Sequence, residues 1–186
     1  MGTIKTTNIE TITGSGTLTL GQSGETISIP SGVTITNNGT QTGFGGTNTP
    51  AFLVSKTTQS ISDSTWNKLQ YDTKTVDTDS AFDNTTNYRF TVPSGKAGLY
   101  FFRANFNCEG LDAGERLQIK ININSVGQNS SFVRAWSSAT DLGWYIETSG
   151  FFNLSVGDYV EIFGLQTEGV SQNATDLTFG GYKILT

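Results

Sequence analysis

The sequence has no histidine, one cysteine and few basic residues, and each shortage excludes a class of function. Without histidine the chain cannot assemble a Ser-His-Asp or Cys-His catalytic group. Cys108 has no partner for a disulfide within the chain, so we expect it to be a small packing residue beside a strand end. The 11 Lys and Arg are dispersed and the net charge is -5, which disfavours a nucleic-acid partner.

Long apolar runs are also missing. No stretch approaches the length of a membrane span, and the first ten residues, with one lysine and no apolar run, do not read as a signal peptide. We therefore expect no membrane insertion. Charged residues reach only 15%, whereas Thr, Ser, Asn and Gly are plentiful. This composition is typical of strand-rich proteins with many turns, and it predicts an all-β fold with almost no helix.

Residues 1–46 differ from the rest of the chain because no aromatic residue precedes Phe44. Ile, Leu and Val alternate with Thr and Ser in three short runs, at 17–20, 26–29 and 33–36. One copy has too little apolar surface for a core, but three copies wound together would bury the apolar row. We interpret this segment as a thin trimeric β stalk that anchors the protein, against the alternative of a disordered polar linker. The glycine spacing excludes collagen, and no heptad pattern is present.

Residues 47–186 form the second predicted domain, which begins after a glycine-rich hinge. Alternating apolar residues and regularly spaced turn signals predict a sandwich or barrel of short antiparallel strands. We expect a polar stretch at 72–87 and strands at 51–54, 65–71, 90–93, 99–107, 116–124, 132–136, 144–148, 151–154, 159–165 and 177–185.

The strand at 99–107 organises this domain because both of its faces are apolar. Leu99 and Phe101 lie on one face with Arg103, and the opposite face carries Tyr100, Phe102, Ala104 and Phe106. A sheet in a lone sandwich buries one face and exposes the other. The second apolar face therefore predicts cover by another subunit or by a folded sheet edge.

Several separated motifs in this domain resemble the globular head of the complement 1q and tumour-necrosis-factor-like families. They are Phe90 with Pro93, Gly98-Leu99-Tyr100-Phe101-Phe102, the run 66–72, the run 154–162, and Phe179-Gly180-Gly181-Tyr182. The resemblance implies a jelly-roll β-sandwich that assembles as a homotrimer. We expect the trimer interface to include Leu99, Phe101, Tyr159, Phe163 and Tyr182.

Two further groups of residues are candidates for ligand binding. Trp136, Asp141, Trp144 and Tyr145 flank one loop, and aromatic faces beside carboxylates are typical of sugar recognition, although one Trp ring is expected in the core. Asp72 lies in the same polar stretch as three calcium candidates, Asp77, Asp79 and Asp83. Their spacing lacks the pattern of an EF-hand, so solvated loop carboxylates are the alternative, and no other cofactor is expected.

These observations favour a non-enzymatic structural protein of a virus particle. We interpret the chain as a trimeric bacteriophage fibre, or as a capsid or tail decoration knob, located on the virion. Residues 1–46, whose composition resembles phage fibre segments, would bind capsid or tail proteins, and the head would bind a host-surface glycan or protein. The alternatives are a secreted bacterial lectin-like adhesin and a tailspike-type polysaccharide hydrolase. The hydrolase would need two paired carboxylates that the sequence does not reveal.

Overall fold

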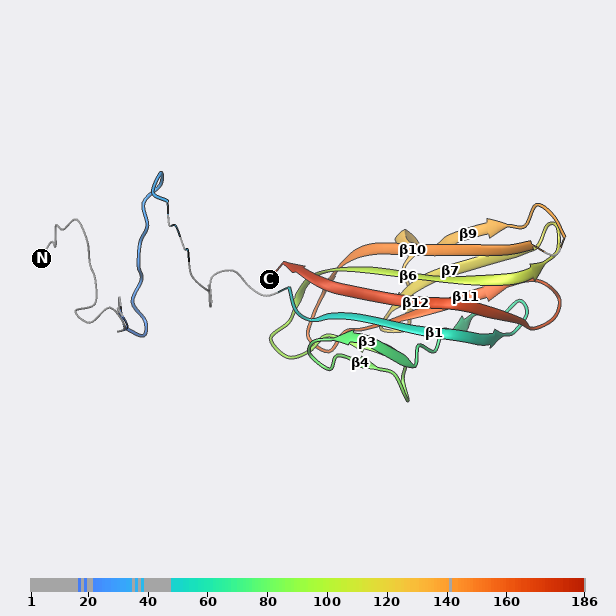
Figure 1. Cartoon of the computed structure of the whole chain (residues 1–186), viewed down its shortest axis with the longest axis horizontal. Helices are drawn as coiled ribbons and strands as arrows, with labels where there is room; N and C mark the ends of the chain where they lie inside the picture. The colour runs from blue at the N-terminus through green and yellow to red at the C-terminus, as the bar shows by residue number, and fades with distance from the viewer. Residues whose placement is uncertain are drawn as a thin grey trace, which may run out of the picture. The chain divides into compact units, whose positions relative to one another are not determined.

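The structure of the protein is a computed structural model that describes residues 17, 19, 22–34, 36, 38, 48–140 and 142–185 (Figure 1). The chain divides into two units, Met1–Phe44 and Gly45–Thr186. Within the described residues the only helical element is the short 3-10 turn η1 (Asn129–Ser131), so the prediction of an all-β fold is confirmed. No helix in this described part is long and apolar enough to cross a membrane.

The second unit is a sandwich of two antiparallel sheets. Sheet A has the strand order β10 (Leu142–Leu154), β6 (Gly98–Leu111), β12 (Gln172–Leu185), β1 (Ala51–Ile61) and β3 (Thr73–Asp77). Sheet B has the order β4 (Phe82–Asp83), β5 (Arg89–Thr91), β11 (Tyr159–Gln166), β7 (Arg116–Ile123) and β8 (Val126–Gly127). β2 (Asn67–Lys68) pairs with β11, and β9 (Val133–Trp136) pairs with β7. The first and last strands of this unit lie side by side in sheet A (Figure 1), as they do in a jelly roll.

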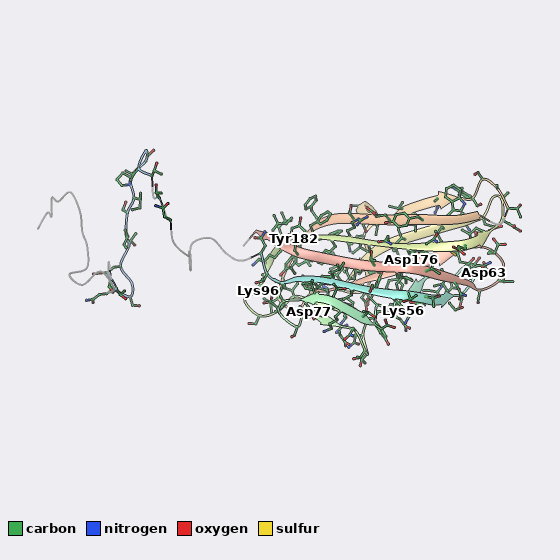
Figure 2. The ribbon with its side chains drawn as sticks, in the orientation of Figure 1. Lys56, Asp63, Asp77, Lys96, Asp176 and Tyr182 are labelled. Carbon is green, nitrogen blue, oxygen red and sulfur yellow. The ribbon has the colours of Figure 1, made fainter. Side chains whose placement is uncertain are left out.

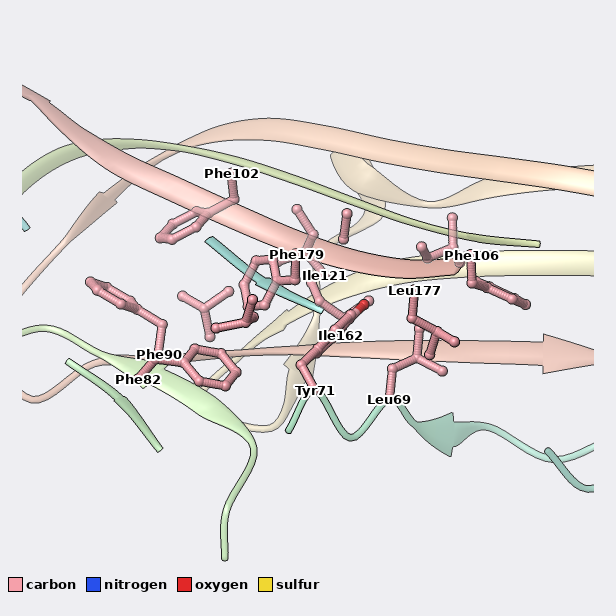
Figure 3. Close-up of a cluster of buried hydrophobic side chains, with 14 of the residues drawn as sticks. Leu69, Tyr71, Phe82, Phe90, Phe102, Phe106, Ile121, Ile162, Leu177 and Phe179 are labelled. Carbon is pink, nitrogen blue, oxygen red and sulfur yellow. The ribbon is translucent and has the colours of Figure 1, made fainter. Parts of the chain in front are cut away.

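Aromatic rings fill the space between the two sheets (Figure 3). Phe52 stacks on Phe90 with ring centroids 4.9 Å apart and meets Phe179 edge-on at the same distance. Phe102 lies 5.5 Å from Phe90, so rings from both sheets form one cluster. Cys108 is fully buried in this core, where desolvation raises the pKa of its thiol to about 12. It is a packing residue.

The central strand β6 has the two-sided character that its sequence predicts. Tyr100, Phe102 and Phe106 are fully buried against the core. Leu99 and Phe101 point to the other side of sheet A and are only half-buried. The long strands β12 and β10 flank β6, so the exposed side of β6 has a neighbouring strand along each of its edges.

Strand boundaries differ from the sequence prediction where apolar alternation is weak. The polar stretch 72–87 contains two strands, β3 and β4; β3 was missed because four of its five residues are exposed. The predicted strands 144–148 and 151–154 are one continuous strand, β10. Gly150 does not mark a turn there: a Cβ at this position would lie 2.7 Å from the Phe152 ring, so the strand needs a glycine for packing.

In the first unit, the described residues form turns in which Glu25 N–H donates to Gln22 and Val33 N–H donates to Pro30. Ile27, Ile29 and Val33 are exposed in the single chain. The described residues of the predicted strands at 26–29 and 33–36 are not strands in the single chain. The predicted strand 17–20 and the hinge lie mostly outside the described residues, and the stalk interpretation stays a prediction.

Candidate functional site

The outer face of sheet A carries an exposed aromatic cluster centred on Phe101. Phe101 on β6 is paired in register with Phe151 on β10 and with Tyr182 on β12. Its ring centroid lies 5.1 Å from that of Phe151 and 5.8 Å from that of Tyr182. Phe151 is 65% exposed and Tyr182 is 44% exposed, although such rings are usually covered. The lone head therefore leaves three adjacent aromatic side chains facing water.

An apolar groove continues from this cluster across β12 and β1. Its volume is about 440 Å³, and its walls include Phe101, Tyr182, Leu53 and Val76. Gly180 keeps the groove open, because a Cβ at this position would lie 3.2 Å from Leu53 Cδ1 and 3.1 Å from a backbone oxygen. The aromatic cluster and this groove together make a continuous apolar surface with residues from all five strands of sheet A. We call it the apolar face.

The same side of sheet A becomes polar farther along β6. Arg103 forms an ion pair with Glu147, and the Tyr145 hydroxyl donates a hydrogen bond of 2.9 Å to Glu147 Oε2. The hydrogen bond from Arg103 holds the pKa of Glu147 below its ordinary value. Tyr182 lies toward one end of the head, near Lys96, while Asp63 lies at the opposite end (Figure 2). The outer side of sheet A is thus apolar around Phe101 and polar around Arg103 and Glu147. A partner that buries the apolar part can therefore dock in only some orientations.

The structure separates the five predicted interface residues into two groups. Leu99, Phe101 and Tyr182 are strand residues of sheet A, and the latter two form the aromatic cluster. Tyr159 and Phe163 belong to sheet B, where Arg89 lies 4.1 Å over the Tyr159 ring. The five residues therefore do not form one patch. Leu99 and the four aromatic residues were grouped as large apolar side chains, and Phe151, Leu53 and Val76 were missed. Phe151 and Leu53 lie in the predicted strands 151–154 and 51–54, whereas Val76 lies in the stretch 72–87 that was predicted to be polar.

The loop aromatics proposed for ligand binding are also separated. Trp136 is 55% exposed on β9 of sheet B, whereas Tyr145 is 53% exposed on β10 of sheet A. Trp144 packs against the core, and its indole N–H donates a 3.1 Å hydrogen bond to Ser137. Asp141 lies outside the described residues. Trp136 and Tyr145 thus lie on different sheets.

Local groups already bind the three carboxylates proposed for calcium. Asp83 accepts hydrogen bonds from the backbone of Thr85, Thr86 and Asn87, which hold its pKa well below the ordinary value. Asp77 accepts from Ala81 N–H at 2.8 Å and pairs with Lys74, and Asp79 lies 3.5 Å from Lys96. Within residues 48–140 and 142–185 no cluster of three or more acidic or thiol ligands could hold a metal ion. These bonds assign the carboxylates a role in shaping turns.

Comparison with known proteins defines the class of fold. No protein-family model and no curated protein matches the sequence. Among solved structures, the globular domain of zebrafish complement 1qA protein has a TM-score of 0.55 and 21% identity, covering 73% of this chain and 98% of that domain. Eiger TNF from S. frugiperda has a TM-score of 0.50 and 10% identity, covering 73% and 92%. The head is therefore a jelly roll of the complement 1q and TNF type, as the sequence motifs predicted.

Proposed function

We propose that the chain is a homotrimer whose heads meet through the apolar face of sheet A. The observation that carries this proposal is the exposed cluster of Phe101, Phe151 and Tyr182 beside an apolar groove. Exposed apolar patches of this kind mark protein contacts, and burying them removes apolar surface from water. The resemblance to the complement 1q and TNF-like heads also implies a homotrimer. The Arg103–Glu147 pair beside the patch would fix how the copies are oriented.

We further propose that the trimer is a non-enzymatic component of a virus particle, a phage fibre or a capsid or tail decoration knob. The support comes from residues 1–46, whose Thr-, Ser- and Gly-rich alternation resembles phage fibre segments. Ile27, Ile29 and Val33, exposed in the single chain, would be covered when three copies wind together. In this arrangement the segment attaches to capsid or tail proteins, and three heads bind the host surface with avidity.

Two measurements test the two parts of this proposal separately. Sedimentation equilibrium of the purified chain should give three times the 20.0 kDa mass of one copy at micromolar concentration. A compact monomer under those conditions would refute assembly through the apolar face. For the second part, the protein should remain with particles purified on a density gradient from cells that carry its gene. Its absence from all such particles would refute the virion role and leave the trimer unaffected.

A further inference from the structure

Sheet B differs from sheet A because its outer side carries cations that stack on aromatic rings. Lys120 Nζ lies 4.0 Å from the centroid of the Trp66 ring, and the Arg134 guanidinium lies 5.2 Å from that of Phe132. Arg116 lies 5.5 Å from the Trp136 ring. The ion pairs within the described residues use other cations, namely Lys56, Lys68, Lys74, Lys96 and Arg103. In a chain of net charge -5, this is a local basic and aromatic surface.

A pocket of about 390 Å³ lies at the centre of this surface. Trp66 and Phe132 form two of its walls, with ring centroids 6.1 Å apart and ring planes inclined at 67°. Lys120 contributes a third side, and the remaining lining residues are Gly127, Gln128 and Asn129. The pocket therefore combines apolar ring faces, a cation and side-chain amides. Ligand sites in proteins commonly have this combination.

Gly127 leaves room in the pocket for a ligand atom. A Cβ on Gly127 would lie 3.3 Å from Lys120 Cδ, 3.5 Å from Lys120 Nζ and 3.3 Å from the Asn122 side-chain oxygen. That oxygen is buried and accepts no hydrogen bond within the described structure. Burial also lowers the pKa of Lys120, which has no carboxylate paired with it.

We propose that this pocket binds a carboxylated saccharide, such as a uronic acid unit of an acidic polysaccharide. The saccharide carboxylate would pair with the Lys120 ammonium, and the side-chain amides of Gln128 and Asn129, which line the pocket, would form hydrogen bonds with sugar hydroxyls. The apolar side of the sugar ring would pack on Phe132. A nucleic acid fits less well, because the chain has a net charge of -5 and Lys120 is the only cation that lines the pocket, whereas a phosphate backbone is bound by several cations. The inference rests on the proposed attachment function and specifies the ligand of its three heads.

Calorimetric titration of the full chain with galacturonate, glucuronate and sialyl oligosaccharides tests this site. We expect binding of at least one acidic oligosaccharide, and none of the matched neutral sugar. Lys120→Gln, which removes the charge, and Gly127→Ala, which fills the space, should each weaken binding of the acidic oligosaccharide by about tenfold or more. Two variants on sheet A serve as controls. Lys56→Gln removes one positive charge, as Lys120→Gln does, and Gly143→Ala adds a methyl 3.3 Å from the flexible Glu109 side chain, as Gly127→Ala does beside Lys120. Both controls should bind as the parent does.

Four results would overturn the inference. The first three are no binding of any acidic oligosaccharide, equal binding of the neutral sugars, and binding that the control variants weaken as much as the pocket variants do. Equal affinity for double-stranded DNA, insensitive to Gly127→Ala, would assign the surface to general anion binding instead. Sedimentation of the same samples keeps the outcomes separate, because a trimer that binds no saccharide refutes the pocket and leaves the assembly proposal intact.

Discussion

The Phe102 ring on β6 occupies the space in which a side chain on Gly181 of β12 would have to lie. A Cβ on Gly181 would be 2.3 Å from Phe102 Cδ1 and 2.8 Å from the Phe101 carbonyl oxygen. The two strands are paired in register at these residues, so neither can move away without breaking the ladder. This relationship explains why a glycine stands between Gly180 and Tyr182, and it places Tyr182 beside Phe101 on the opposite side of the sheet.

Replacing Gly181 with alanine should therefore destabilise the head. The added methyl collides with a backbone oxygen as well as with a ring, and overpacking of this kind costs about 1–3 kcal/mol. Chemical denaturation followed by tryptophan fluorescence measures the loss. Gly143→Ala is the control, because the nearest atom to its added methyl is Glu109 Cγ, 3.3 Å away on a flexible side chain. An equal or larger loss of stability for Gly143→Ala than for Gly181→Ala would contradict the role given to the Phe102 ring and the backbone oxygen.

A charge at the centre of the apolar face should separate the copies. Phe101→Asp places a carboxylate between Phe151 and Tyr182, where assembly would bury it without a partner. We expect the sedimentation mass to fall from a trimer to the 20.0 kDa of one chain, with the β-sheet circular dichroism retained because Phe101 is only half-buried.

Phe163→Asp provides the matched control for this charge, because Phe163 belongs to sheet B. Both residues are in the interface predicted from sequence, but Phe101 is on sheet A and Phe163 is on sheet B. We expect the Phe163 variant to remain a trimer. If instead Phe163→Asp gives monomers and Phe101→Asp does not, the copies meet through sheet B and the assignment of the apolar face is wrong.

The fold was predictable from sequence because its strongest signal is local. The apolar residues on both sides of β6 indicate a strand that is covered on both faces. The run Phe179-Gly180-Gly181-Tyr182 resembles a motif of the complement 1q and TNF-like heads. The Lys56–Ile61 half of β1 was not predictable, since it has little apolar alternation and forms by pairing with β12, as in Ser60 with Asn173. Partner strands supply this part of the fold, and the local sequence does not encode it.

The candidate sites were less predictable than the fold, because they depend on residues that are distant along the chain. Trp66 lies near β2, Phe132 follows η1, and Lys120 is on β7. These three residues come together only because β2 and β7 pair with the two opposite edges of β11. The predicted pair Trp136 and Trp144 is separated by only the loop 137–143, yet one ring is exposed and the other packs on the core.

The hydroxyl of Tyr71 is buried in the core and has no hydrogen-bond partner within the described structure. Tyr71→Phe removes an unsatisfied polar group, so we expect the free energy of unfolding to stay equal or to rise by about 1 kcal/mol. Tyr100→Phe is the matched comparison, because the Tyr100 hydroxyl donates a 2.5 Å hydrogen bond to the Lys96 carbonyl. That variant should lose about 1 kcal/mol. A larger loss for Tyr71→Phe than for Tyr100→Phe would mean that the Tyr71 hydroxyl has a bound partner.

The Asp83 carboxylate should make the stability of the head depend on pH. Backbone N–H groups of Thr86 and Thr85 donate to it at 2.9 and 3.0 Å and lower its pKa from the ordinary 3.8. Because the folded pKa is the lower one, this stabilisation is present above the unfolded value and is lost as the pH falls below about 4.

Asp83→Asn removes the charge and one of the two acceptor oxygens, so it should cost about 1 kcal/mol at neutral pH and progressively less in acid. Denaturant unfolding of both proteins between about pH 7 and pH 3 measures the difference. Asp112→Asn is the control, since the Asp112 carboxylate forms no hydrogen bond or ion pair with the described residues of the head, and its replacement should change stability little at any pH. A difference between Asp83→Asn and the parent that stays constant down to about pH 3 would mean that the carboxylate charge contributes nothing to this turn.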